Sequence, residues 1–115
     1  MEEEFIPYEE ALALKELGFN ENCFGFFGAK ELFIKITNKE RISESNVLAP
    51  LYQQAFRWFR EKYKLYNVVH QFEHKKGTDE EFLSEVVYAE ATYHKTYDEA
   101  ELECLRKLIE IVKQK

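Results

Sequence analysis

Apolar positions recur at helical spacing in three segments of the chain. The first runs from about Pro7 to Leu17, with Pro suited to a first turn and Gly18 following the last apolar residue. The second begins at Ala49-Pro50 and reaches about Lys64, and its apolar face is mainly aromatic. The third runs from about Tyr97 to the C-terminus, where Thr96 followed by Glu99 fits a capping box. We therefore expect three helices.

Four other segments are predicted to be strands, from alternation of side chains or from the hairpin-sized loop between the first two. They are Cys23 to Phe27, Glu31 to Thr37, Tyr66 to His74 and Phe82 to Tyr93. Gly28-Ala29-Lys30 makes a hairpin-sized loop between the first two. In the second strand Leu32, Ile34 and Ile36 alternate with Phe33 and Lys35, which predicts one apolar and one mixed face.

The predicted order is α-β-β-α-β-β-α. Two hairpins indicate an α+β fold, in which a four-stranded antiparallel sheet has three helices mainly on one face. The length of 115 residues is typical of a single domain, so we expect residues 1–115 to form one. Residues 38–48 are the longest irregular stretch, rich in Ser, Asn and charge. A connection of that length is a reasonable place for function or mobility.

Composition indicates a globular protein, with 45% hydrophobic and 33% charged residues. Two cysteines, Cys23 and Cys104, are too few for a disulfide framework, and we expect both to be reduced and packed in the core. The acidic start Met-Glu-Glu-Glu differs from a signal peptide, and no apolar run approaches the roughly 20 residues that span a bilayer. These features predict a cytoplasmic protein without a membrane partner.

The net charge of −6 is unevenly distributed. Residues 49–76 carry six basic and two acidic side chains, whereas residues 77–103 carry one basic and nine acidic side chains. A single basic stretch in an acidic molecule disfavours general nucleic-acid binding, which needs a broad basic surface. The acids of 77–103 leave DNA mimicry as a third, minor hypothesis, which requires those carboxylates to be exposed on one face.

No motif with catalytic spacing is present. The chain lacks a Gly-rich phosphate loop, a nucleophile elbow, Cys-x-x-Cys and His-Glu-x-x-His. His70 and His74 share a predicted strand face but lie about 13 Å apart along it, too far to hold one metal ion. The helical pattern turns the Cys104 thiol inward, and His94 precedes a helix cap. We expect neither an enzyme nor a bound metal or cofactor.

The basic stretch holds the candidate binding residues. Arg57, Arg60 and Lys64 follow i, i+3, i+7 spacing along the second helix, and Trp58 lies at the border of this stripe with the apolar face. An exposed indole beside guanidinium groups suits a nucleotide-like ligand. The same residue types form hot spots for protein partners. Alternatively, Trp58 is buried and the arginines pair with the surplus acids.

Three blocks of sequence carry a resemblance to a known family. They are APLYQQAFRWFREKY (49–63), FIPYEEALALKELGF (5–19) and YDEAELECLRKLIEIVK (97–113). In their residues and their order these blocks resemble a family of small uncharacterised proteins from tailed phages and prophages of Bacteroidota. The resemblance implies expression inside a bacterial host cell, and it assigns no catalytic or binding residue.

The leading hypothesis is a non-enzymatic protein-interaction module that acts on a host or phage protein. The alternative, from a different class, is a small-ligand binder that sequesters a nucleotide-like anion through Arg57, Arg60 and Lys64. The aromatic excess or a polar-faced sheet edge is also compatible with a homodimer.

Overall fold

The computed structural model describes residues 2–40, 42–71, 77, 79–86 and 91–114. It divides the chain into two compact units, residues 1–55 and 56–115, and each is described by itself. The boundary lies within helix α2 (Tyr52–Tyr63), and the prediction of a single domain stays a prediction. His74 and positions 87–90 of the predicted strands lie outside the described residues.

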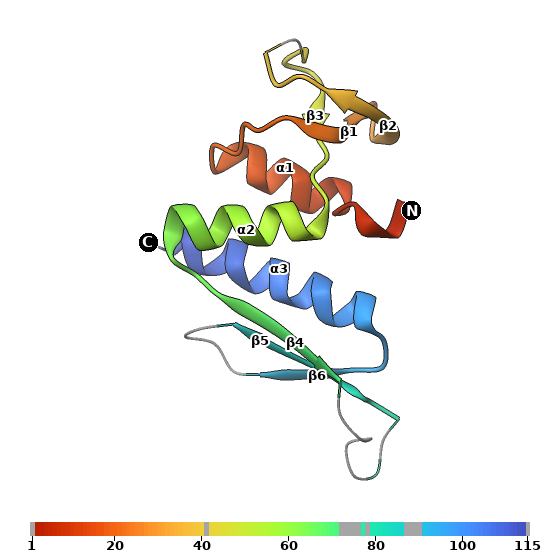
Figure 1. Ribbon diagram of the computed structural model, residues 1–115, viewed down its shortest axis with the longest axis vertical. Coiled ribbons are helices and arrows are strands. Elements are labelled where there is room, and N and C mark those ends of the chain that lie inside the picture. Colours follow the sequence, from red (N-terminus) through yellow and green to blue (C-terminus); the bar gives the residue numbers. More distant parts are fainter. Residues whose placement is uncertain (1, 41, 72–76, 78, 87–90, 115) are drawn as a thin grey trace. The chain divides into compact units, whose positions relative to one another are not determined.

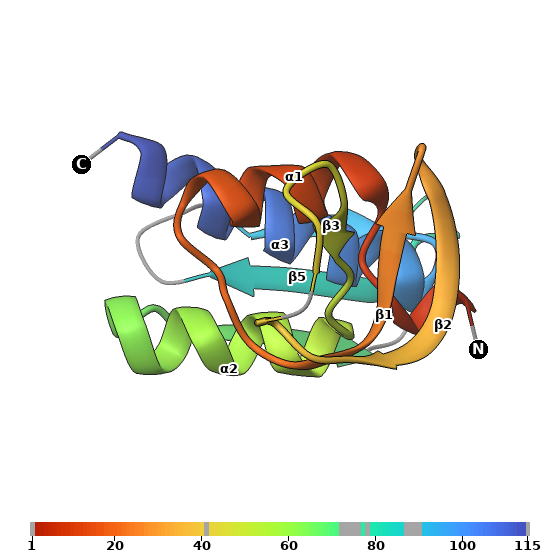
Figure 2. The ribbon, with the colours of Figure 1, turned by 90° about the horizontal axis from the view of Figure 1, so that it is seen from above.

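The first unit combines helix α1 (Tyr8–Glu16) with a three-stranded antiparallel sheet (Figures 1 and 2). Strands β1 (Cys23–Gly28), β2 (Glu31–Thr37) and β3 (Val47–Leu48) have the order β2-β1-β3, which makes β2 an edge strand. A short 3-10 helix (Glu2–Glu4) precedes α1. The Tyr8 ring on α1 meets the Phe27 ring of β1 edge-on, with the centroids 5.5 Å apart. The buried side chains of this unit include Phe5, Ile6, Ala11, Leu14, Phe19, Cys23, Phe27, Val47 and Leu48.

Local sequence signals determine where α1 ends and where the hairpin turns. Gly18 has a φ of 98°, and the N–H of Phe19 donates to the carbonyl of Leu14 at 2.9 Å, which is the closing bond of a Schellman motif. The two-residue hairpin loop consists of Ala29 and Lys30, with φ values of 52° and 69°. Positive φ at both positions is the signature of a type I′ turn, whose twist matches that of the strands it joins.

The second unit places helix α3 (Tyr97–Lys113) on one face of a second antiparallel sheet (Figure 1). Its strands are β4 (Asn67–Gln71), β5 (Phe82–Val86) and β6 (Thr92–His94), in the order β4-β5-β6. The N–H of Glu99 donates to Thr96 Oγ1 at 3.1 Å, so the predicted N-cap is confirmed. The buried side of α3 comprises Ala100, Cys104, Leu105, Leu108, Ile109 and Val112.

The α+β class and the three helices are confirmed, but the single four-stranded sheet is wrong. The described residues form two three-stranded antiparallel sheets in the order α-β-β-β-α-β-β-β-α. Val47 and Leu48 pair with Phe27 and Phe26 as a third strand, although two residues are too few to show a period. The long strand predicted from Phe82 instead provides both β5 and β6, which pair with each other. Alternation shows where side chains point and does not show where a strand reverses.

Candidate functional site

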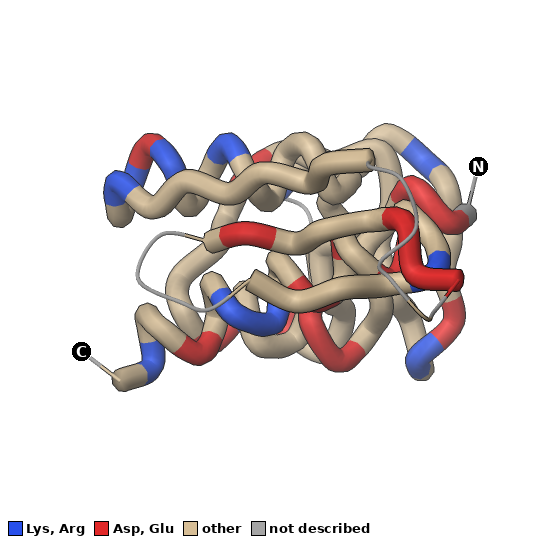
Figure 3. Tube along the Cα trace, turned by 90° about the horizontal axis from the view of Figure 1, so that it is seen from below, with Lys and Arg blue, Asp and Glu red and all other residues tan. Residues whose placement is uncertain are grey.

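The basic residues of the predicted stripe are at the surface, but the neighbouring Trp58 is not. Arg57, Arg60 and Lys64 are exposed, and Figure 3 shows basic positions recurring along α2. Trp58, in contrast, is only 6% exposed. Its ring packs edge-on against Phe59 and Tyr63, with centroid distances of 5.0 and 5.5 Å. The indole therefore offers no open face on which a base could stack.

Lys64 lies beyond the end of α2 and therefore does not follow the helical spacing from which the stripe was predicted. Helix α2 ends at Tyr63, and Lys64 has a φ of 59°, in the left-handed region. The N–H of Leu65 returns to the carbonyl of Phe59 at 3.3 Å. Arg57 and Arg60 thus remain one turn apart on α2, while the position of Lys64 is set by the turn that follows the helix.

Both thiols are buried and held in the protonated form. Burial and the nearby Glu21 carboxylate raise the pKa of Cys23 to about 12, and its Sγ lies 3.3 Å from the carbonyl of Glu21. Burial also raises the pKa of Cys104, whose Sγ lies 2.9 Å from Ser84 Oγ. Because the thiolate is the nucleophilic form, neither cysteine is arranged for nucleophilic chemistry. The prediction that both pack in the core is confirmed.

The described histidines make pairwise contacts. His70 Nε2 lies 2.7 Å from Glu85 Oε2 on the exposed surface, and His94 Nε2 lies 2.7 Å from Thr92 Oγ1. Within the described ranges, no group of three His, Cys, Asp or Glu side chains is arranged to hold a metal ion. Within the described part of 77–103, the acids considered for DNA mimicry are divided between the β5 region and α3, and Glu101 and Glu103 are half-buried.

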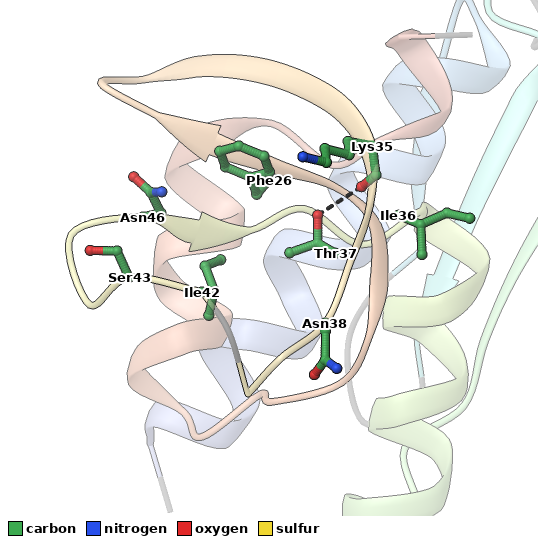
Figure 4. Close-up of a pocket in the computed structure, with 8 residues that line it drawn as sticks. All are labelled: Phe26, Lys35, Ile36, Thr37, Asn38, Ile42, Ser43 and Asn46. Carbon is green, nitrogen blue, oxygen red and sulfur yellow. Dashed lines mark hydrogen bonds between the residues drawn. The ribbon is translucent and has the colours of Figure 1, made fainter.

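A hollow of the first unit lies between the β1–β2 hairpin and residues 38–40 and 42–46 (Figure 4). Its volume is about 430 Å³. Phe26 and Ile42 contribute apolar side chains to its lining, whereas the side chain of Ile36, which also borders the hollow, points away from them (Figure 4). The polar lining consists of Lys35, Thr37, Asn38, Ser43 and Asn46. We call this feature the loop hollow.

Residues 38–40 and 42–46 are organised by short-range hydrogen bonds. Asn38 Oδ1 accepts from the N–H of Glu40 at 2.9 Å, and Ser43 Oγ lies 3.0 Å from Ser45 Oγ. The N–H of Asn46 donates to the carbonyl of Ser43 at 3.0 Å. These are the turns that Asn and Ser favour, so the polar composition that marked this stretch as irregular also gives it shape.

Lys15 ties this segment to α1. Its Nζ donates to the carbonyls of Glu44 and Asn46, the latter at 3.2 Å. A smaller hollow of about 170 Å³ lies on this side, lined by Phe19 and Leu48 among others. Ile42, Ser43 and Asn46 line both hollows, which therefore lie next to each other.

The hairpin beside the loop hollow exposes large apolar side chains. Phe24, Phe33, Ile34 and Ile36 are 54%, 46%, 48% and 78% exposed. Alternation predicted an apolar face on β2, but sequence reasoning missed that this face is not covered. Gly25 stands opposite Ile34 in the register and has no side chain to cover it.

Comparison with protein-family models, with curated proteins and with solved structures finds no match to this chain. In the part of the chain that the structure describes, no helix combines the length and apolar character needed to cross a membrane.

Proposed function

We propose that this protein is a non-enzymatic interaction module that binds another protein through the loop hollow. The observation that carries the proposal is the half-buried apolar lining of Phe26 and Ile42 within a polar rim. Apolar pockets ringed by hydrogen-bonding groups are typical of sites that receive an anchor side chain from a partner.

The rim indicates what such a partner segment would present. The amides of Asn38 and Asn46 and the hydroxyl of Ser43 can pair with an extended backbone. Among the described residues of the lining, Lys35 carries the one charged side chain, so an acidic residue next to the apolar anchor would be favoured. A segment of protein with an apolar residue beside an acidic one fits both features.

The resemblance to phage and prophage proteins supports a setting inside a bacterial cell, where the partner would be a host or phage protein. In that setting a small acidic module acts by occupying a surface of its target.

Sequestration of a nucleotide-like anion remains the second candidate, because Arg57 and Arg60 are exposed one turn apart. Two guanidinium groups at that spacing can contact one phosphate group. With Trp58 buried, this mode would rely on charge rather than on stacking.

The test is capture from host and phage-infected lysates with the full chain as bait. Ile42→Asp places a charge in the hollow, and we expect it to abolish capture of the specific partner. Val68→Asp is the matched control, because Val68 is an exposed residue on β4 in the other unit. A partner lost equally with both variants, or with neither, contradicts binding at the loop hollow.

Thermal shifts with nucleoside mono- and triphosphates separate the two candidates. Protein binding predicts no shift beyond that given by inorganic phosphate. A nucleotide-specific shift that disappears in Arg60→Ala would favour the small-ligand function instead.

A further inference from the structure

We propose that β2 pairs with β2 of a second copy of this chain, antiparallel and about a two-fold axis. In the order β2-β1-β3, β2 has β1 on one side and an open edge on the other, within the described residues. All seven of its residues are exposed or half-buried. An open strand of this length is a template for another strand.

The backbone of β2 is set up for pairing at that edge. In a hairpin with a two-residue loop, the pair that closes the loop is hydrogen-bonded, and bonded and non-bonded pairs then alternate. Gly28 and Glu31 close this loop, so Phe33 turns its N–H and C=O toward β1. Leu32 and Ile34 then present theirs to the open edge.

The sequence of β2 is complementary to itself in one two-fold register. When the axis passes through Phe33, Glu31 lies opposite Lys35 of the second copy, and Lys35 lies opposite Glu31. Phe33 meets its own counterpart between these two ion pairs. Glu31 and Phe33 are non-hydrogen-bonded positions at this edge, where facing side chains approach most closely, and Lys35 begins the stretch in which β2 shifts its register against β1. Opposite charges and aromatic pairs stabilise an antiparallel sheet at such positions.

The same register covers the apolar face of β2. Leu32 lies opposite Ile34 of the second copy, and Ile34 lies opposite Leu32. Ile34 is 48% exposed in the single chain, and Gly25 of β1 cannot cover it. Pairing therefore supplies apolar neighbours that the strand lacks in the single chain.

Lys35 gives this pairing its specificity. A lysine in an edge strand ordinarily opposes pairing with other strands. In the two-fold register it meets a carboxylate instead, so β2 rejects most strands and accepts its own copy. If the axis passed through Ile34, Glu31 would face Thr37 and no ion pair would form. Charge reversal therefore reports the register.

This inference goes beyond the proposed function, because it concerns association of the chain with its own copy; the two share Lys35, which also lines the loop hollow. Association is measured on the chain alone, so its failure is distinguished from loss of a partner at the loop hollow. A seven-residue strand pair is a small interface, so association should be weak. Sedimentation velocity on the full chain, from about 5 µM to about 1 mM at low salt, should show a reversible monomer–dimer equilibrium.

Four samples test the register. Glu31→Lys alone and Lys35→Glu alone each place like charges opposite one another, and each should raise the dissociation constant by about tenfold or more. An equimolar mixture of the two should form a heterodimer, because every facing pair is then of opposite charge. The double variant should restore the homodimer.

Glu40→Lys and Lys39→Glu are the charge-matched controls, since both residues are exposed and follow β2. They should leave the equilibrium within about twofold of the wild type. A wild-type chain that stays monomeric up to about 1 mM overturns the proposal. A dimer that responds equally to the strand variants and to the controls overturns it as well.

Discussion

Replacing Ala29 with glycine should stabilise the protein. Ala29 has a φ of 52° in the hairpin loop, where a side chain costs roughly 1–2 kcal/mol. Glycine removes that cost but adds about 0.5–1 kcal/mol of chain entropy to be lost on folding. The net gain is about 0.5–1 kcal/mol. Lys30→Gly should gain less, because Lys30 Nζ lies 5.9 Å from the centroid of the Tyr8 ring and that contact would be lost.

Urea unfolding followed by far-UV circular dichroism measures this effect. With a slope of roughly 1–3 kcal/mol per molar urea, the midpoint of Ala29→Gly should rise by about 0.2–1 M. Ala13→Gly is the matched control, since Ala13 lies inside α1, where glycine costs about 1 kcal/mol and should lower the midpoint. An unchanged or lower midpoint for Ala29→Gly refutes the reasoning from backbone strain.

Three further predictions follow from local geometry. Gly25→Ala should cost about 1–3 kcal/mol in urea unfolding, because its Cβ would lie 3.0 Å from the carbonyl oxygen of Phe33; Gly28→Ala, at 3.3 Å from its nearest neighbour, should cost less. Thr96→Ala should cost about 1 kcal/mol through loss of the helix cap while Thr96→Ser keeps most of it, and equal stability of the two variants would contradict the role of the cap. The folded-state pKa of Cys23, about 12, lies above its ordinary value of 9.0, so its contribution to stability is present below pH 9.0 and is lost as the pH rises toward 12. Between pH 8 and about pH 10.5, the urea midpoint of the wild type should fall by more than that of Cys23→Ala. Equal falls in the two proteins would count against this linkage.

Part of the loop hollow could be predicted from the sequence. The polar composition of 38–48 predicts an irregular stretch that is a place for function or mobility. The turns of Asn38 and Ser43 follow from residue preference. The hollow itself also requires Phe26 of β1 and Ile36 of β2, which meet this loop only in the folded unit. No short-range pattern in the sequence predicts the contact between these strands and the loop.

Trp58 shows the opposite case. Its helical position allowed either an exposed or a buried indole, since it lies at the border between the apolar and basic faces of α2. In the folded protein the Trp58 indole is buried, and the Phe59 and Tyr63 rings pack against it. A border position has no preferred environment in the sequence, because burial depends on which elements pack there.

By itself, the sequence determined the features that arise from contacts within a few residues: the Thr96 cap, the Gly18 helix end, the β1–β2 hairpin and the α+β class. Only the tertiary structure decided that the strands form two sheets and that Ile34 and Ile36 stay uncovered. The reason is one of range. Caps and turns are stabilised by neighbours along the chain, whereas strand partners and buried faces are selected among residues far apart in sequence.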